Sequence, residues 1–273
     1  MIPQIIHYCW LSNDPIPDQL QEYIKTWKKF LPDYEFILWD FNRFNKNSSI
    51  WVQEAFSKKK YAFAADYIRI FAVYHYGGFY LDSDVEILKS LNNLLHLKAA
   101  ICWQSENDGF EAACFGAEKG APWLKKCLDY YKNRHFILSD GKIDIKPLPR
   151  IMEETLRKAN YRIKSVFSLN EAVQSEDTNT LAILPSSFFS PKSFKTRLIN
   201  VTEQTYSIHH FAASWVNPYD NQSIIGKILV FLHLPPIGEI WRFFHLPDTN
   251  IRGRLFKKRK QQNKKGEPTC NRP

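Results

Sequence analysis

The sequence predicts an α/β fold in which helices flank a mainly parallel sheet. Segments with helical spacing of apolar residues alternate with short apolar runs in the first part of the 273-residue chain, and this alternation is typical of parallel sheets covered by helices. A glycine pair, Gly77-Gly78, separates a long apolar segment from a short apolar run that ends in Asp82-Ser83-Asp84. Because ligands of such sheets bind beyond the carboxyl ends of strands, we expect the functional site there.

The first part of the chain alternates predicted strands with predicted helices. The strands are short apolar runs at Ile5–Trp10, Glu35–Trp39 and Phe79–Leu81. The helices are predicted at Asp18–Leu31, Ser49–Lys60 and Tyr61–Tyr76. Apolar residues crowd the third helix without strand-like alternation, which indicates a buried helix. Glycine tolerates the left-handed conformation that commonly ends a helix, so Gly77-Gly78 marks its end.

The pattern is weaker beyond the Asp-Ser-Asp segment. Apolar runs predict strands at Ala99–Trp103, Glu111–Phe115 and Ser207–Phe211. Helices are predicted at Pro122–Arg134 and Pro149–Ala159, where proline stands in the first turn, a position that tolerates it.

Four charged side chains are predicted to meet at the end of the third strand. Asp66 and Arg69 are three residues apart on one helix face. Asp82 and Asp84 are two residues apart, so they point to the same side if the backbone is extended. Paired carboxylates suit Mg²⁺ or Mn²⁺, which would neutralise a diphosphate leaving group. The alternative is a solvated turn beside a structural Asp66–Arg69 pair. The glycine pair and the apolar strand before the carboxylates favour the metal site.

The net charge of +9 is concentrated at the C-terminus. Residues 251–273 contain nine Lys or Arg and one acidic residue, whereas the other 250 residues contain 28 basic and 27 acidic residues. A nearly neutral body argues against a nucleic-acid-binding protein, in which basic residues spread along a face. An adaptor that binds membranes or nucleic acid through the tail remains an alternative from another class, but it leaves the carboxylates unexplained.

The cysteines and the N-terminus predict a cytoplasmic protein. The five cysteines contain no Cys-x-x-Cys pair, which favours free thiols in a reducing compartment. The N-terminal residues lack the basic and apolar regions of a signal peptide. No apolar run reaches the roughly 18 residues that predict a membrane span.

Three blocks of the sequence resemble the family 32 glycosyltransferases, which include bacterial capsular-polysaccharide transferases and fungal α-mannosyltransferases. The family is related to the glucosylating domain of large bacterial toxins. The central block matches at Ala62, Ala65, Asp66, Arg69, Tyr76, Gly77, Gly78, Tyr80, Asp82 and Asp84. Residues 2–10 and 209–215 resemble two further motifs of the family. The resemblance implies a GT-A type domain over residues 1–218, followed by a C-terminal extension over residues 219–273.

The resemblance implies a set of donor-binding residues. Trp10 would stack on the nucleotide base, and Asn42 would touch the nucleotide. Asp66 and Arg69 would hold sugar hydroxyls and a phosphate, for which the fork of Arg is suited, and Tyr80 would lie beside the donor. A core tryptophan and a loop-capping asparagine are the alternatives for Trp10 and Asn42.

The resemblance also implies a metal shell. Asp82 would contact the ribose or sugar, directly or through the metal, and Asp84 would be the main metal ligand. With Asp66 and Arg69, these two residues form the implied catalytic set. His209 or His210 would complete the shell, and the family pattern favours His209 by its spacing to Ser214 and Trp215. Imidazole suits Mn²⁺ better than Mg²⁺. Packed or surface histidines are the alternative. Ser214 and Trp215 would bind the diphosphate as a loop closes over it.

The implied reaction is sugar transfer with retention from a nucleotide sugar, with UDP favoured, to a glycan or lipid-linked glycan of a surface polysaccharide such as a capsule. Glu106, Asp108 and Glu111 are candidates for a nucleophile, and a solvated acidic loop is the alternative. A front-face reaction needs none and relies on stabilisation of the leaving group. A metal-dependent sugar-phosphate transferase is the alternative enzyme.

The C-terminal extension predicts attachment to a membrane. Ile224–Leu246 is rich in apolar residues and stands before the basic tail, a combination that favours an anionic membrane surface. We therefore expect a peripheral protein on the inner face of the cytoplasmic membrane. A packed helix followed by a solvated tail is the alternative.

Overall fold

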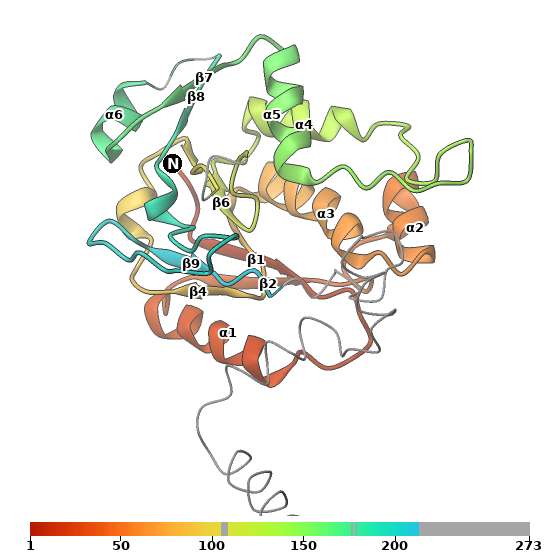
Figure 1. Cartoon of the computed structure of the whole chain (residues 1–273), viewed down its shortest axis with the longest axis horizontal. Helices are drawn as coiled ribbons and strands as arrows, with labels where there is room; N and C mark the ends of the chain where they lie inside the picture. Colours follow the sequence, from red (N-terminus) through yellow and green to blue (C-terminus); the bar gives the residue numbers. More distant parts are fainter. Residues whose placement is uncertain (105–108, 176, 178, 213–273) are drawn as a thin grey trace, which may run out of the picture. The chain divides into compact units, whose positions relative to one another are not determined.

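The computed structural model of the chain describes residues 1–104, 109–175, 177 and 179–212. A five-stranded sheet lies at its centre, with the strand order β2-β1-β3-β6-β5 (Figure 1). The strands are β1 (Ile5–Cys9), β2 (Glu35–Trp39), β3 (Gly78–Leu81), β5 (Ala99–Ala100) and β6 (Cys114–Ala117). β1 pairs in parallel with β2 and β3, whereas β6 is antiparallel to β3 and β5. The predicted α/β fold is confirmed, but the sheet is mixed and not mainly parallel, because β6 and β5 add an antiparallel part that the sequence did not indicate.

Helices cover both faces of this sheet (Figure 1). They are α1 (Asp18–Phe30), α2 (Ile50–Ser57), α3 (Tyr61–Tyr76), α4 (Pro122–Tyr130) and α5 (Leu148–Lys158). The α1 side contains a core with Trp27, Phe79 and Leu81, and the α3 side contains a core with Trp51 and Tyr80. Alternate residues of β3 thus enter opposite cores, which explains why the whole strand is apolar.

Two small sheets and four short helical segments complete the described part. β4 (Val85–Ile87) is antiparallel to β9 (Ser207–His209), and β7 (Arg162–Ser165) is parallel to β8 (Thr180–Ile183). The segments are α6 (Leu169–Gln174) and the 3₁₀ helices η1 (Lys46–Ser48), η2 (Asn92–Leu94) and η4 (Ser186–Phe188). The sequence did not predict β4, β7, β8 or α6. β4 has three residues, and three of the four residues of β7 are exposed, so neither strand has an apolar run to mark it.

Several predicted elements match the structure and others are shorter. The bounds of α3 and β2 agree with the prediction. The predicted strand Ala99–Trp103 stops pairing in the sheet after Ala100, because Cys102 and Trp103 form isolated bridges with Leu184 and Phe110. The predicted helix Pro122–Arg134 ends as α4 at Tyr130.

The glycine pair fixes the path from α3 into β3. Gly77 has φ 71°, and its N–H donates to the carbonyl of Val73 at 2.8 Å to close the helix. Gly78 has φ 96°, and a Cβ at this position would lie 2.5 Å from the carbonyl oxygen of Ile5. Only glycine therefore fits both the left-handed backbone and the close approach of β1.

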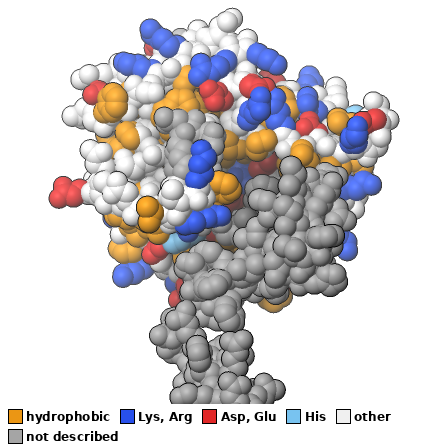
Figure 2. All heavy atoms as spheres, in the orientation of Figure 1, with side chains coloured by type: hydrophobic (Ala, Val, Ile, Leu, Met, Phe, Trp, Pro, Cys, Tyr) orange, Lys and Arg blue, Asp and Glu red, His pale blue; other side chains and the backbone are white. Residues whose placement is uncertain are grey.

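The exposed charges and the cysteines agree with the sequence analysis where they are described. Acidic side chains lie among the lysines and arginines on the face that Figure 2 displays. Cys9, Cys102, Cys114 and Cys127 are free and buried. Within the described ranges, no helix is both long enough and apolar enough to span a bilayer. The predicted extension, residues 219–273, lies outside the described residues, so the domain boundary stays a prediction.

His7 ties β1 to the glycine pair through a neutral imidazole. Its Nδ1 lies 3.1 Å from Nε1 of Trp39, and its Nε2 lies 2.8 Å from the carbonyl oxygen of Gly77. Indole N–H is a donor only, so Nδ1 accepts and Nε2–H donates to Gly77. Burial lowers the pKa of His7 from 6.5 to about 4, although the bond to Gly77 opposes the shift. A second proton on Nδ1 would face the Trp39 N–H.

We predict that acid destabilises the protein through His7. Between pH 6.5 and pH 4 the unfolded chain binds the proton that the folded imidazole excludes, so stability falls as pH falls. The pKa difference corresponds to about 3 kcal/mol of unfolding free energy. His7→Gln keeps a donor and an acceptor but does not titrate. Urea unfolding across this range should show a smaller pH dependence in the variant, and equal pH dependence in both proteins would contradict the prediction.

Candidate active site

The Asp82-Ser83-Asp84 segment forms a turn between β3 and β4. β3 ends at Leu81, and the N–H of Val85 donates to the carbonyl of Asp82 at 3.0 Å. The expectation of an extended backbone at Asp82 and Asp84 is therefore wrong, because a hydrogen bond over three residues closes the chain on itself. The turn nevertheless brings the two carboxylates together. Oxygen atoms of Asp82 and Asp84 and a ring nitrogen of His209 all lie within 4.8 Å of one another.

Arg69 joins the helix to this turn. Its Nη1 donates to Oδ2 of Asp82 at 3.1 Å and to the carbonyl of Ala112 at 2.8 Å. Its Nη2 lies 3.3 Å from Oδ1 of Asp66. The guanidinium also lies over the ring of Tyr80 at 4.7 Å, and the Tyr80 hydroxyl donates to Oδ1 of Asp82 at 2.7 Å. The predicted meeting of helix and turn charges is thus present, and Arg69 is its centre.

The burial of this network shifts the carboxyl groups toward their neutral forms. Arg69 is 6% exposed and Asp66 is 9% exposed. Burial raises the pKa of Asp66 to about 7, with Arg69 opposing the shift and Asp82 adding to it. Burial also raises the pKa of Asp82, again against the effect of Arg69. Arg69 is therefore one cation between two buried carboxyl groups, and its charge does not fully offset the cost of burying both.

His209 reaches the turn because β9 pairs with β4. The register places His209 opposite Val85, the residue after Asp84. Nε2 of His209 lies 3.6 Å from Oδ2 of Asp84, and this oxygen also accepts the N–H of Ala212 at 2.8 Å. Nδ1 of His209 lies 3.2 Å from Oε1 of Glu111. Glu111 therefore determines which nitrogen of His209 faces Asp84.

The two carboxylates beside His209 stabilise its charged form. Burial alone would lower the pKa of His209, but Glu111 and Asp84 raise it to about 10. Burial would raise the pKa of Asp84, but His209 and the Ala212 N–H lower it to about 2. An imidazolium thus occupies the space between two carboxylates. A divalent cation bound to Asp84 and Nε2 of His209 would replace that proton.

The donor atoms fit a divalent metal ion. Two carboxylates and one imidazole form an oxygen and nitrogen donor set that suits Mn²⁺. The contact of Nδ1 with a buried carboxylate is the arrangement common around metal-binding histidines. Asp82, Asp84 and His209 are therefore the residues that would hold the ion.

His210 lies in a different environment from its neighbour. Its Nε2 is 2.8 Å from Oε2 of Glu86, and its ring stacks on Tyr23 with centroids 4.2 Å apart. Successive residues of an extended segment point to opposite sides, so His209 faces Asp84 while His210 faces α1. His210 does not belong to the cluster of Asp82, Asp84 and His209.

Trp10 and Asn42 lie at the same edge of the sheet but bond within their own loops. β2, β1 and β3 are parallel, so the residues after their carboxyl ends share one edge. Trp10 is half-buried, and its Nε1 donates to the carbonyl of Asp14 at 2.7 Å. Asn42 is exposed, and its Nδ2 donates to Oδ2 of Asp40 at 2.9 Å. Their predicted contacts with a nucleotide stay predictions.

Glu111 has a role that sequence reasoning missed. It was one of the candidates for a nucleophile, but it is 1% exposed and accepts the Ala113 N–H at 2.8 Å in addition to its contact with His209. No local pattern relates it to His209, which is 98 residues away in the chain. The other two candidates, Glu106 and Asp108, lie outside the described residues, as do Ser214 and Trp215.

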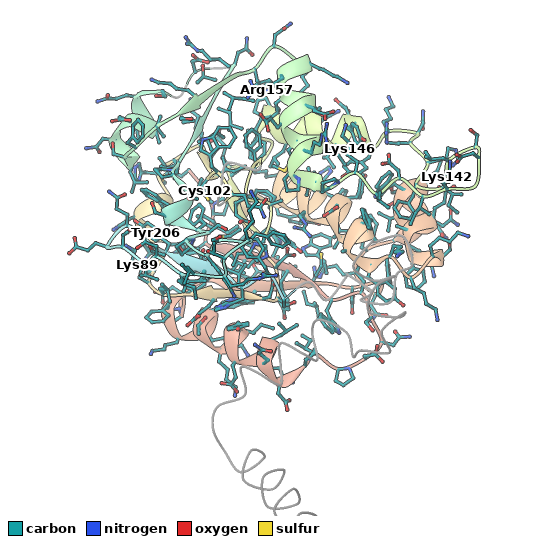
Figure 3. The ribbon with its side chains drawn as sticks, in the orientation of Figure 1. Lys89, Cys102, Lys142, Lys146, Arg157 and Tyr206 are labelled. Carbon is teal, nitrogen blue, oxygen red and sulfur yellow. The ribbon has the colours of Figure 1, made fainter. Side chains whose placement is uncertain are left out.

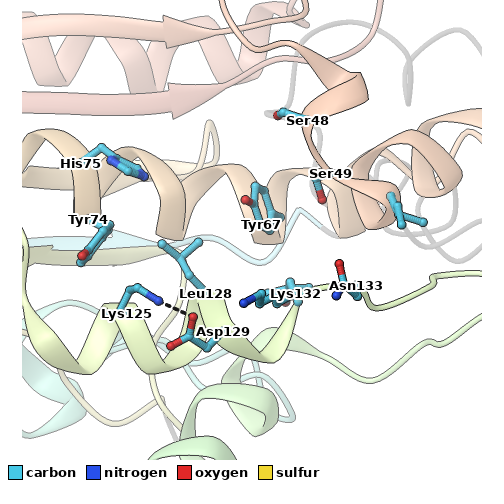
Figure 4. A pocket seen from close by; sticks show the side chains of 12 residues that line it. Ser48, Ser49, Tyr67, Tyr74, His75, Lys125, Leu128, Asp129, Lys132 and Asn133 are labelled. Carbon is cyan, nitrogen blue, oxygen red and sulfur yellow. Dashed lines mark hydrogen bonds and ion pairs between the residues drawn. The ribbon is translucent and has the colours of Figure 1, made fainter.

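A separate cavity of about 460 Å³ lies beside α3 and α4 (Figure 4). It is lined by tyrosine, lysine and small polar side chains, among them Tyr67, Tyr74 and Lys132. Lys125 and Asp129 form an ion pair at its wall. None of the predicted site residues lines this cavity, so it is distinct from the carboxylate cluster.

Comparisons with known proteins agree with this site. Residues 17–100 match the family described as "Glycosyltransferase sugar-binding region containing DXD motif". "Inositol phosphoceramide mannosyltransferase 3" of Schizosaccharomyces pombe is 35% identical over 127 residues, which cover 45% of this chain and 35% of that protein. "Mannosyl phosphorylinositol ceramide synthase CSH1" of Saccharomyces cerevisiae is 33% identical over 147 residues, which cover 50% and 38%. The chain thus spans less than half the length of these relatives.

Solved structures resemble the chain distantly. "PaToxG Glycosyltransferase" is 20% identical with a TM-score of 0.44 and covers 58% of this chain and 69% of its own. The galactosyltransferase LgtC, in complex with donor and acceptor sugar analogues, is 14% identical with a TM-score of 0.38 and covers 87% and 99%. The family match includes Asp66, Arg69, Asp82 and Asp84. Residues 17–100 therefore match the glycosyltransferase sugar-binding region with a DXD motif, and over this segment the resemblance predicted from the motifs is confirmed.

Proposed function

We propose that the protein transfers a hexosyl group from a nucleotide sugar to a lipid-linked acceptor and that the reaction requires a divalent metal ion, with Mn²⁺ favoured. The observation that carries this proposal is the cluster of Asp82, Asp84 and His209 beside the buried Arg69–Asp66 pair. The relatives' names describe mannosyl transfer to inositol phosphoceramide. By analogy we propose mannose as the sugar and a lipid with a polar head as the acceptor, in place of a surface polysaccharide.

Different residues would bind the metal ion and the sugar. Asp82, Asp84 and His209 would hold the ion, which when bound neutralises charge on the diphosphate. Arg69 is almost fully buried and already bonded to Asp82, Ala112 and Asp66. We therefore assign it a positioning role, in which it orients the two carboxylates toward the donor. The side chain of Asp66 is 12% exposed, which leaves a small surface for a sugar hydroxyl.

The proposed reaction retains the anomeric configuration without an enzyme nucleophile. Glu111, the described member of the nucleophile candidates, is committed to His209 and to the Ala113 N–H. In a front-face reaction the leaving phosphate accepts the proton of the acceptor hydroxyl. Stabilisation of the leaving group is then the largest contribution of the protein.

We also propose that the protein works at the inner face of the cytoplasmic membrane. A lipid-linked acceptor requires access to a bilayer, and nine basic residues stand in residues 251–273. The predicted membrane contact through residues 219–273 lies outside the described residues and stays part of the proposal.

We predict that Asp84→Asn removes donor turnover. Purified protein with Mn²⁺ should release one nucleoside diphosphate from a panel of UDP- and GDP-sugars, and the variant should be slower by on the order of 100-fold, because a charge that stabilises the leaving group is lost. Asp33→Asn, at an exposed position, is the matched control. Release of a nucleoside monophosphate would instead identify a sugar-phosphate transferase. Turnover equal in wild type and Asp84→Asn would refute the proposed site.

We predict that Glu111→Gln weakens metal binding about 10- to 100-fold, because the side chain that orients His209 loses its charge. Calorimetric titration of Mn²⁺ into the protein measures this directly, without turnover. Glu35→Gln, at an exposed position, should bind Mn²⁺ as wild type does. Unchanged affinity in a folded Glu111→Gln protein would show that Glu111 has only a packing role.

A further inference from the structure

The segment of residues 190–202, between η4 and β9, groups exposed apolar side chains. Phe194, Leu198, Ile199 and Val201 are 50%, 73%, 45% and 51% exposed. Four large apolar side chains thus lie open within eight residues. The other exposed large apolar side chains of the described residues occur singly or in pairs along the chain. An exposed group of this kind indicates a surface that is covered by a partner.

The segment is a defined loop with its own hydrogen bonds. Lys192 and Ile199 form an antiparallel bridge, and the N–H of Ser193 donates to the carbonyl of Leu198 at 2.9 Å. Arg197 has φ 63°, and its N–H donates to the carbonyl of Ser193 at 3.0 Å. The apolar side chains therefore lie on a hairpin-like loop that is already folded. Binding of a partner would not have to order this loop, so that entropic cost is absent.

The loop contacts the chain that leaves β9 at the active site. Nζ of Lys192 donates to the carbonyl of His210 at 2.8 Å, and the Phe194 ring meets the Phe211 ring edge to face at 5.4 Å. The Phe211 ring also lies 4.0 Å from the His209 ring, measured between centroids. A partner bound to the loop would therefore lie close to the metal-binding histidine.

The charge of the loop favours an anionic partner. From Ser190 to Thr202 the sequence has three basic residues and no acidic residue. Lys195 and Arg197 are exposed, whereas Lys192 is buried. Lys89 adds a positive charge beside β9: its Nζ lies 4.2 Å from the ring centre of Tyr206 and bonds to the carbonyl of Glu203 (Figure 3). Apolar side chains next to basic ones are the composition that binds the interface of anionic bilayers.

We propose that residues 190–202 form a docking loop that inserts apolar side chains, Leu198 foremost, into the interface of an anionic lipid bilayer. The contact is independent of the C-terminal extension. The contact would place the active site at the membrane surface, from which a lipid acceptor would enter. Only this consequence rests on the proposed function. The membrane contact itself requires no catalysis.

The test is sedimentation of the full-length protein with phosphatidylcholine vesicles that contain or lack phosphatidylserine. The variant Leu198→Ser/Ile199→Ser should lower the partition coefficient on anionic vesicles by about tenfold or more, the effect expected from removing large apolar side chains. Leu138→Ser/Ile145→Ser is the matched control, because it removes two exposed apolar side chains elsewhere and should partition as wild type does. Lys195→Glu/Arg197→Glu should reduce the preference for phosphatidylserine.

Other occupants of the loop predict different results. Equal partition of the loop variant and wild type would overturn the proposal. A wild-type dimer that dissociates in the variant, seen by analytical ultracentrifugation without lipid, would assign the loop to a second copy of the chain. A fall in unfolding free energy without a change in partition would assign it to a segment of the same chain. Nucleotide-sugar hydrolysis without lipid reports the proposed function separately, and the loop variants should retain it.

Discussion

The buried guanidinium of Arg69 is the interaction on which the site depends. It links α3 to the turn after β3 through Asp82, and to the chain before β6 through the carbonyl of Ala112. A buried cation must be paired, and removal of one partner of a buried pair is strongly destabilising. Lysine could not replace Arg69, because a single ammonium lacks the fork that reaches Asp66, Asp82 and Ala112 together. The contacts of Arg69 therefore contribute to the stability of the fold. They hold Asp66 and Asp82 in place before any ligand binds.

The glycine pair and His7 make this arrangement possible. Arg69 reaches the turn only if β3 runs back beside β1 directly after α3, and that path requires the positive φ angles of Gly77 and Gly78. His7 fixes the same corner by donating to the carbonyl of Gly77. The ring makes this bond in its neutral form, because Nδ1 accepts from the Trp39 N–H and burial lowers the pKa. The predicted acid sensitivity of the fold and the position of the Asp82 and Asp84 carboxylates thus have a common structural origin.

The sequence indicated well the half of the site around Arg69, because that half is local. Asp66, Arg69, Asp82 and Asp84 stand within 19 residues, and a helix, two glycines and one strand bring them together. It indicated the other half less well. The Glu111–His209 contact spans 98 residues and depends on the β4–β9 pairing, and β4 is too short for a periodic signal. The choice between His209 and His210 depends on which residue of an extended pair faces Asp84, and the register of β9 could not be read locally. The prediction of an extended backbone at Asp82–Asp84 was wrong. Apolar residues flank a turn much as they flank the end of a strand, so the pattern does not distinguish the two.

The two halves of the site also differ in whether the family match includes them. The match ends at residue 100 and contains the four charges around Arg69, whereas Glu111, His209 and the loop of residues 190–202 lie beyond it. The charged residues around Arg69 therefore belong to the segment that matches the family. His209 completes the same cluster from the segment that also carries the apolar loop, through Phe211. The proposed membrane contact and the proposed metal site are thus joined by the ring contacts from Phe194 through Phe211 to His209. A shift of the loop would therefore first change the position of His209 Nε2 relative to Asp84.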